Sequence, residues 1–276
     1  MPGAHDDVAA RLGDVVAAAP GRLSAAIVTD DGWTWRHDAD RAVLSASTIK
    51  VPILLATLRL VEHGSLDLNQ TVRVPELRVG GSGPLLLLPS VTAVPLGELL
   101  ALMIALSDND ATNAVLDLVG FGAVGNLLAS VPTRHTVLAR RMMDTAAAAR
   151  GEHNLTSAAD LVAIMVALRG GRLLDEEGTA LALEILRTQQ FREGLPGYLP
   201  ESVTVASKTG ELTGVRGDVA LLETDGRWVA VAVLADGLDE GMAAGADRGT
   251  AVLPAFAELG ELAAGLIGLP PTSPAG

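Results

Sequence analysis

Predicted strands lie near the two ends of this chain, and a long helical stretch separates them. Runs of apolar residues predict strands at 23–29 and 33–37, and three more at 203–207, 215–223 and 228–235. Strands so far apart can share one antiparallel sheet if the chain between them folds as a second layer or lobe. The pattern therefore predicts an α+β protein, with an antiparallel sheet flanked by helices and an all-helical lobe beside it.

The helical middle of the chain and its flanking helices set the boundaries of the two lobes. A helix at 5–19 precedes the first strand, and a final helix at 248–266 follows the last one. We place the sheet lobe at 1–40 and 195–276, and the helical lobe at 41–194. The helices predicted in the helical lobe lie at about 47–64, 96–106, 110–119, 122–129, 157–168 and 176–187.

Charge and composition narrow the range of partners. The formal net charge of −13 argues against nucleic acid and anionic membranes. The chain has no cysteine and no histidines at metal-ligand spacing, so we expect no metal and no cofactor. It starts without a signal peptide and has no apolar run long enough to cross a bilayer, which predicts a cytoplasmic protein unless a leader has been removed. We expect a monomer that acts on a small molecule.

The segment Ser47-Thr48-Ile49-Lys50 has the spacing of an activated serine nucleophile. A serine hydroxyl attacks poorly unless a base removes its proton. Residues three apart on a helix share one face, so we expect Lys50 Nζ within hydrogen-bonding range of Ser47 Oγ. The alternative is a capping serine with a solvated lysine. Lys50 leads directly into the apolar run 51–55, however, which is an unusual place for a charge without a role.

The segment Ser107-Asp108-Asn109 follows an apolar helix and could serve two purposes. Its hydroxyl could relay a proton to a leaving group, and its amide could hold a substrate carbonyl. The same three residues could instead cap the helix that follows. The segment alone does not decide between these interpretations.

The segment Lys208-Thr209-Gly210 comes at the end of the predicted strand 203–207. A lysine and a hydroxyl at a strand edge could bind a carboxylate. The glycine would let a substrate backbone approach the strand closely. The alternative is an ordinary strand end without a binding role.

Taken in order, the three segments resemble those of the class A β-lactamases, within the superfamily of penicillin-recognising serine enzymes. The likeness covers about residues 20–265, and the stretches that carry it are 47–54, 81–83, 99–113, 208–211 and 216–220. The resemblance implies a β-lactamase/transpeptidase-like fold with the active site between the two lobes. It also implies a serine hydrolase that opens the β-lactam amide.

The resemblance implies a chemical role for five residues. Ser47 would form the acyl-enzyme, and Lys50 would help to deprotonate it. Ser107 would pass a proton to the leaving nitrogen, with Lys208 close by. The backbone N–H groups of Ser47 and Glu211 would form the oxyanion hole that stabilises the tetrahedral intermediate.

The same resemblance assigns substrate binding to residues in the second segment and in or after the third. Asn109 would hold the side-chain amide of the substrate, while Thr209 and Arg216 would bind its carboxylate and Gly210 would lie at the strand edge beside it. The Glu211 side chain is unusual beside a carboxylate site. It could repel an anionic β-lactam or point to solvent, and both interpretations stay open.

The chain departs from class A β-lactamases in the loop after the second segment. The family's deacylating glutamate falls on Met142, and the asparagine that follows it falls on Ala146. A thioether cannot take a proton from water, so this position does not supply the base that the family uses to release the acyl group. Asp144 is the candidate for a substitute base, with Glu152 and His153 as further candidates, although Asp144 could instead pin the loop through an arginine.

Three functions fit these residues. The first is a β-lactamase. The second is a related esterase, amidase or D-amino-acid peptidase that β-lactams acylate but that turns them over slowly, which the methionine favours. The third is a non-catalytic binding or sensor domain on the same fold, against which the intact trio of segments argues.

Overall fold

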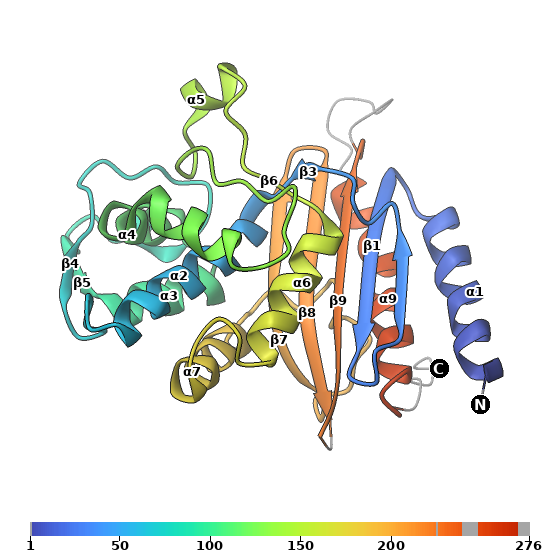
Figure 1. Ribbon diagram of the computed structural model, residues 1–276. Helices are drawn as coiled ribbons and strands as arrows, with labels where there is room; N and C mark the ends of the chain where they lie inside the picture. The colour runs from blue at the N-terminus through green and yellow to red at the C-terminus, as the bar shows by residue number, and fades with distance from the viewer. Residues whose placement is uncertain (1, 225, 239–247, 270–276) are drawn as a thin grey trace.

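A five-stranded antiparallel sheet forms the centre of the molecule (Figure 1). The computed structural model describes residues 2–224, 226–238 and 248–269. The sheet has the order β2-β1-β9-β8-β7, so strands from the two ends of the chain lie side by side. Its strands are β1 (Arg22–Thr29), β2 (Thr34–His37), β7 (Thr204–Leu212), β8 (Val215–Thr224) and β9 (Arg227–Asp236). The α+β prediction, with one antiparallel sheet built from both ends, is confirmed.

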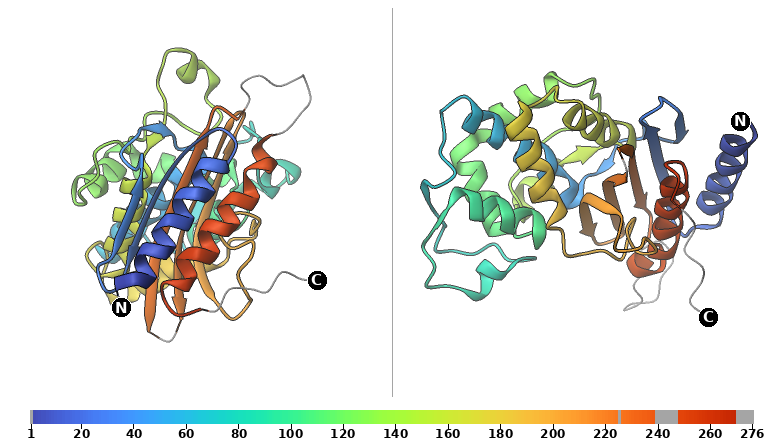
Figure 2. Two further views of the ribbon diagram at one scale, coloured as in Figure 1. Left: turned by 90° about the vertical axis from the view of Figure 1, so that its right-hand side faces the viewer. Right: turned by 90° about the horizontal axis from the view of Figure 1, so that it is seen from below.

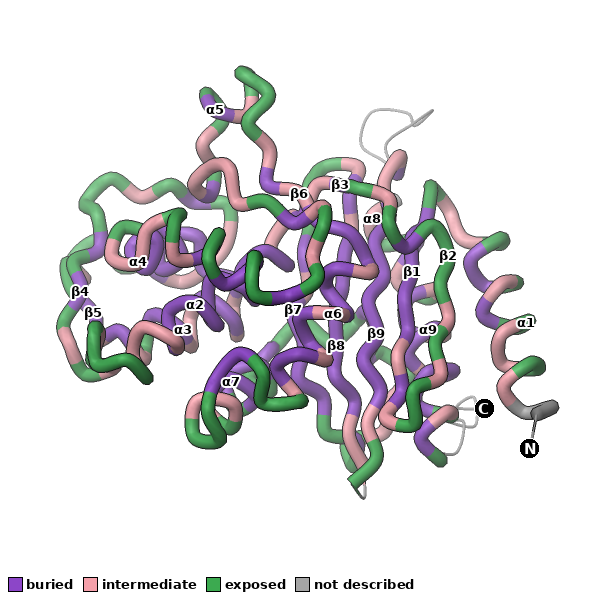
Figure 3. Tube along the Cα trace, viewed as in Figure 1, coloured by how far each residue is buried: buried purple, intermediate pink, exposed green. Residues whose placement is uncertain are grey.

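Helices cover both faces of this sheet. Helices α1 (Pro2–Ala18) and α9 (Leu253–Gly265) lie side by side on one face, where their apolar residues pack against β1, β8 and β9 (Figure 2). Helix α6 (Ala158–Arg169) lies on the other face, against β1 and β9, although the sequence places it in the helical lobe. Figure 3 shows the consequence, since the central strands are buried along most of their length. The short helix α8 (Arg248–Ala251) precedes α9.

The helical lobe packs around one buried helix. Helix α2 (Lys50–Glu62) contacts α3 (Leu96–Ala105), α4 (Asn109–Ala129) and α7 (Glu176–Arg187), and its first nine residues are buried. The sequence predicts two helices where α4 stands, and the helix is indeed kinked there. Gly120 has a φ of 75°, which a side chain would disfavour. Helix α4 is long and apolar enough to cross a bilayer, but half of its apolar stretch is buried inside the protein, as in a core helix.

Several short elements were not predicted, because two or three residues show no periodicity. Strand β3 (Val43–Leu44) pairs with β6 (Leu155–Thr156), and β4 (Thr71–Arg73) pairs with β5 (Ala93–Pro95). Two 3₁₀ helices, η1 (Ala46–Ile49) and η2 (Pro84–Leu87), complete the fold, together with the short helix α5 (Thr145–Ala149), which forms where the sequence allows a short helix at 145–150. The β3–β6 pair brings the loop that carries α5 beside η1.

The structure corrects two local expectations. Ser47 lies in η1, one turn before α2 begins, rather than on the first turn of the long helix. Lys208-Thr209-Gly210 lies inside β7 and not after its end, because the backbone of β7 keeps pairing with β8 as far as Leu212. Strand β7 is an edge of the sheet, so one side of its backbone remains open to a partner.

Candidate active site

A cleft of about 640 Å³ lies where η1, the start of α4, the strands β7 and β8, and the loop before α5 meet. Most of the residues that the sequence predicts as functional line it, namely Ser47, Ser107, Asn109, Thr209, Gly210, Glu211 and Arg216. Lys50 and Lys208 are fully buried behind the cleft surface. Three segments that are far apart in the sequence therefore meet at one cavity.

Ser47 is partly buried and lies on the cleft wall formed by η1. The preceding residue, Ala46, has a φ of 46°, a left-handed conformation that is uncommon for a residue other than glycine. Gly210 on β7 explains how the strand can come so near. A Cβ at that position would lie 3.0 Å from the backbone nitrogen of Ser47. A side chain there would crowd the backbone N–H that the resemblance assigns to the oxyanion hole.

Lys50 is the centre of a buried hydrogen-bond network. Its Nζ lies 2.6 Å from the carbonyl oxygen of Ser107, 3.0 Å from Ser107 Oγ and 2.9 Å from Asn109 Oδ1. No hydrogen bond joins Lys50 Nζ to Ser47 Oγ within the part of the chain that the structure describes, so the expected direct bond is not formed. The amine instead points toward the second segment, where the carbonyl and hydroxyl oxygens of Ser107 and the amide oxygen of Asn109 accept its hydrogen bonds.

Ser107 links the two lysines. Its Oγ accepts a hydrogen bond from Lys208 Nζ at 3.2 Å as well as from Lys50. The backbone of Ser107 is left-handed, with a φ of 54°, and this conformation directs both its carbonyl and its hydroxyl toward Lys50. Such a conformation costs on the order of 1 kcal/mol and usually persists where a site needs it.

The electrostatics of the two lysines follow from their burial. Burial lowers the pKa of Lys50 well below its ordinary value, and the neighbouring Lys208 cation lowers it further. Burial also lowers the pKa of Lys208, to about 7, although Asp218 opposes the effect. A share of neutral amine is therefore present near neutral pH, and a neutral amine is the form that can accept a proton.

The structure confirms that the second segment caps a helix, while its proposed roles toward a substrate stay a prediction. Asp108 caps α4 by accepting a hydrogen bond at Oδ1 from the backbone N–H of Ala111 at 2.8 Å, while its Oδ2 accepts one from the backbone N–H of Leu85 in η2 at 2.9 Å. Burial raises the pKa of this carboxyl group, while those backbone bonds oppose the rise. The cap fixes the flanking residues Ser107 and Asn109, which carry the contacts to Lys50.

One face of the β7–β8 pair presents four polar side chains to the cleft. Thr209 pairs with Asp218 across the two strands, and Glu211 pairs with Arg216. Cross-strand partners share a face, and so do residues two apart on a strand. Arg216 Nη1 lies 2.8 Å from Glu211 Oε2, so the side chain expected to bind a substrate carboxylate already contacts one. Glu211 thus pairs with Arg216 while most of its side chain stays exposed to solvent.

Asp218 is a site residue that the sequence analysis missed. Its carboxyl group is buried, and Oδ2 accepts a hydrogen bond from the backbone N–H of Leu195 at 2.9 Å. Oδ1 is buried without a hydrogen-bond partner in the described residues. Burial raises the pKa of Asp218 to about 7, although the Leu195 bond and the Lys208 charge oppose the rise. A charged residue inside an apolar strand is the signal that could have identified it.

This raised pKa predicts a pH-dependent stability. A carboxyl group has a pKa of about 3.8 when exposed, so the folded state holds a proton on Asp218 that the unfolded chain has lost between about pH 4 and 7. Stability therefore falls as the pH rises through this range. Relative to an Asp218→Asn variant, we expect the wild type to lose on the order of 2 kcal/mol of unfolding free energy from pH 4.5 to 7.5. Urea unfolding of both proteins at the two pH values measures it, and equal pH dependence would contradict the prediction.

Met142 lines the cleft where a deacylating base is expected. The side chain of Asn113 forms two hydrogen bonds with the backbone of Met142. Its Oδ1 accepts one from the Met142 N–H at 2.9 Å, and its Nδ2 donates one to the Met142 carbonyl at 3.1 Å. Asn154 fixes the same loop in a similar way, through hydrogen bonds to the backbone of Ala139 and Arg140. The thioether position is thus set by two asparagines that sequence reasoning did not single out.

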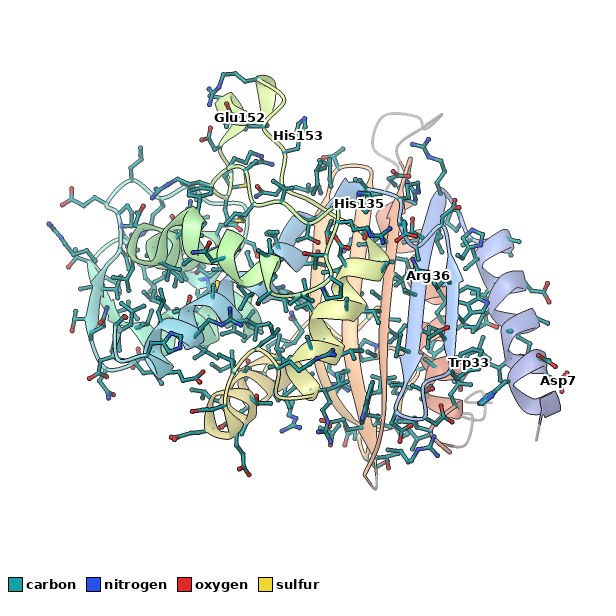
Figure 4. All side chains as sticks on the ribbon, in the orientation of Figure 1. Asp7, Trp33, Arg36, His135, Glu152 and His153 are labelled. Carbon is teal, nitrogen blue, oxygen red and sulfur yellow. The ribbon has the colours of Figure 1, made fainter. Side chains whose placement is uncertain are left out.

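The candidate substitute bases lie outside the cleft lining. Asp144 caps α5, with Oδ1 accepting a hydrogen bond from the backbone N–H of Ala147 at 2.8 Å. Glu152 forms an exposed ion pair with Arg150. Figure 4 shows Glu152 and His153 on the projecting loop around α5, away from the two lobes. Asp144 therefore has a structural role here, and we do not retain it as the deacylating base.

No group of three or more histidine, aspartate or glutamate side chains is placed to hold a metal ion in the described parts of the chain. The cleft carries a serine hydroxyl and a strand edge, and two buried amines lie behind it. A sheet lobe and a helical lobe with these groups between them define the class of penicillin-recognising serine enzymes.

Comparison with known proteins names the family. The model of the beta-lactamase enzyme family matches residues 7–262, and this chain belongs to that family. The chain is similar to the crystal structure of a beta-lactamase from Sphaerobacter thermophilus, with 33% sequence identity and a TM-score of 0.82. The match covers 94% of this chain and 97% of that one. The family and fold that the sequence resemblance implied are confirmed.

Two similar proteins carry names that describe different roles, one enzymatic and one regulatory. A beta-lactamase of Rhodobacter capsulatus is 28% identical over 230 residues, which cover 75% of this chain and 73% of the relative. The beta-lactamase regulatory protein BlaB of Streptomyces cacaoi is 25% identical over 268 residues, covering 78% of this chain and 85% of the relative. Membership of the family therefore leaves the activity to be argued from the site.

Proposed function

We propose that this protein is a serine acyl hydrolase of the class A β-lactamase type, which opens a β-lactam amide through an acyl-enzyme on Ser47. The observation that carries the proposal is the buried network behind the cleft, in which Lys50 and Lys208 both contact Ser107 Oγ. Burying two amines costs free energy, and titratable groups buried at such a cost cluster at functional sites. The cleft of about 640 Å³ suits a small molecule.

Acylation uses the low pKa of Lys50. Neutral Lys50 takes the proton of Ser47 Oγ, directly after a small side-chain rotation or through Ser107, and the oxygen bonds to the lactam carbonyl carbon. As the carbon–nitrogen bond breaks, Ser107 gives its proton to the leaving nitrogen and regains one from Lys208 or Lys50. The backbone N–H groups of Ser47 and Glu211 donate to the carbonyl oxygen while it carries negative charge.

Deacylation lacks an evident base. Water must attack the acyl-enzyme, and Met142 offers no group that accepts a proton at the position expected for one. This observation favours a second candidate function, that of an esterase, amidase or D-amino-acid peptidase. β-Lactams would acylate such an enzyme, and the acyl group would be released slowly. In both functions Ser47 is acylated, and they differ in the rate at which the acyl group is released.

A chromogenic cephalosporin distinguishes these functions. Rapid mixing at known enzyme concentration should give a burst of about one equivalent of product, followed by a slower steady state. A steady state nearly as fast as the burst supports the β-lactamase, whereas a very slow one supports the second candidate. Ser47→Ala should show no burst, and a wild type without a burst or turnover would support a non-catalytic sensor domain instead.

The two lysines predict the pH profile of acylation. The rate should rise on the acidic side as Lys50 loses its proton, because only the neutral amine accepts one. It should fall above about pH 7 as Lys208 loses the charge that supports Ser107 and the substrate. Burst rates from pH 5 to 9 measure this bell-shaped dependence of the acylation rate on pH. The Lys208→Met variant should lose the decrease on the alkaline side. A rate that keeps rising to pH 9 would contradict these assignments.

A further inference from the structure

The ion pair between Glu211 and Arg216 lines the cleft together with Thr209. The Arg216 side chain is only 17% exposed, whereas that of Glu211 is 63% exposed, so the carboxylate is the more accessible partner of the pair. Within the described residues, Glu211 is the carboxylate that the guanidinium contacts. A group that binds Arg216 from the cleft therefore has to share the guanidinium with the Glu211 carboxylate.

Two further residues with carboxyl groups line the same cleft. They are Glu193 and Asp218, and Asp218 shares the face of the β7–β8 pair with Arg216. Asp218 carries only part of a negative charge near neutral pH, because its pKa is raised to about 7, so the Glu211 carboxylate is the charge that an approaching anion meets at Arg216. A substrate carboxylate bound to Thr209 and Arg216 would have to displace Glu211 or lie beside it, and like charges a few ångströms apart repel.

We propose that Glu211 is a specificity-determining residue, which makes the cleft prefer acyl substrates with an uncharged amide or ester group where they face Thr209 and Arg216. The inference rests on the proposed function, because it concerns the substrate of the same acyl-transfer site. An uncharged carbonyl can accept a hydrogen bond from the Thr209 hydroxyl without opposing Glu211. A carboxylate gains little from a guanidinium whose charge is already compensated.

The size of the effect is moderate, because the pair is partly exposed. Solvent screens a carboxylate with this exposure, and such ion pairs contribute little to stability. Glu211 can therefore swing away when a ligand binds, and it biases the choice of substrate without closing the cleft. A selectivity of about tenfold is the expected scale for one screened like-charge contact.

Two matched esters test the inference. Both carry the same N-acylglycyl group, and their leaving groups are 3-hydroxybenzoate, with a carboxylate, and 3-hydroxybenzamide, without one. The readout is the ratio of kcat/KM for the acid ester to kcat/KM for the amide ester. We expect the wild type to favour the amide ester, and Glu211→Gln to shift the ratio about tenfold toward the acid ester. The ratio cancels any general change in activity.

Two further variants serve as comparisons. Glu184→Gln removes an equivalent charge from the exposed side of α7, outside the cleft lining, and should leave the ratio unchanged. Arg216→Gln should move the ratio further toward the amide ester. A shift below threefold in Glu211→Gln, or an equal shift in Glu184→Gln, overturns the inference while the proposed function stands. Absence of hydrolysis and of any acyl adduct in the wild type overturns both.

Discussion

Replacing Met142 by glutamate should convert a slow acyl-enzyme into one that turns over. Methionine and glutamate are unbranched and of similar length, and the backbone at this position is fixed by Asn113 on both sides. The new carboxylate would therefore reach into the cleft from the wall that Met142 now lines. A positioned general base contributes on the order of 100-fold or more, so we expect deacylation to accelerate about 100-fold. The steady-state rate after the cephalosporin burst measures it.

Met142→Gln is the matched control for this prediction. Glutamine has the shape of glutamate but cannot take a proton from water. It should leave deacylation near the wild-type rate, while acylation stays similar in both variants. Equal acceleration by glutamine and glutamate would show that polarity or space matters there and not base catalysis. No acceleration by glutamate would mean that the water is activated from another wall of the cleft.

Replacing Lys50 by methionine should reduce the rate of acylation about 1,000-fold. The methionine fills nearly the same space in the core but has no nitrogen that could take the Ser47 proton. Loss of an activating base from a serine nucleophile typically costs 100-fold to 10,000-fold. The second-order rate constant for acylation by a penicillin is the quantity to compare.

Folding of this variant needs its own check, because the carbonyl of Ser107 and the amide oxygen of Asn109 lose a donor. Circular dichroism and the thermal midpoint show whether the lobes stay assembled. Lys208→Met provides a comparison with the same loss of charge, and we expect it to retain more acylation than Lys50→Met. If both lysine variants acylate at the wild-type rate, neither amine serves as the base.

Much of the fold could be predicted because its signals are long or repeated. The strand runs 23–29 and 228–235 predicted a sheet from both chain ends, and β1 indeed pairs with β9. The full length of β7 was not predicted, because Gly210 suggests an end and only the pairing with β8 shows that the strand continues. Short pairs such as β3–β6 depend on tertiary contacts and leave no local pattern.

The members of the candidate site could be predicted better than their contacts. The spacing of Ser47 and Lys50 predicted that the two residues lie near each other. The direction of the amine, however, depends on Ser107, whose left-handed backbone has no signature in the sequence. The pair of Glu211 and Arg216 needed the strand register, which places them opposite each other. One signal was overlooked, since Lys50 and Lys208 are the only two lysines among 276 residues.

The most direct measurement is intact-mass spectrometry of the protein mixed with a penicillin, sampled over time and followed by peptide mapping. Rapid gain of one penicillin mass, on the peptide that contains Ser47 and absent from Ser47→Ala, is the predicted result. An unmodified protein beside intact penicillin at every time, or an adduct on a different peptide, would contradict the assignment of Ser47 as the nucleophile.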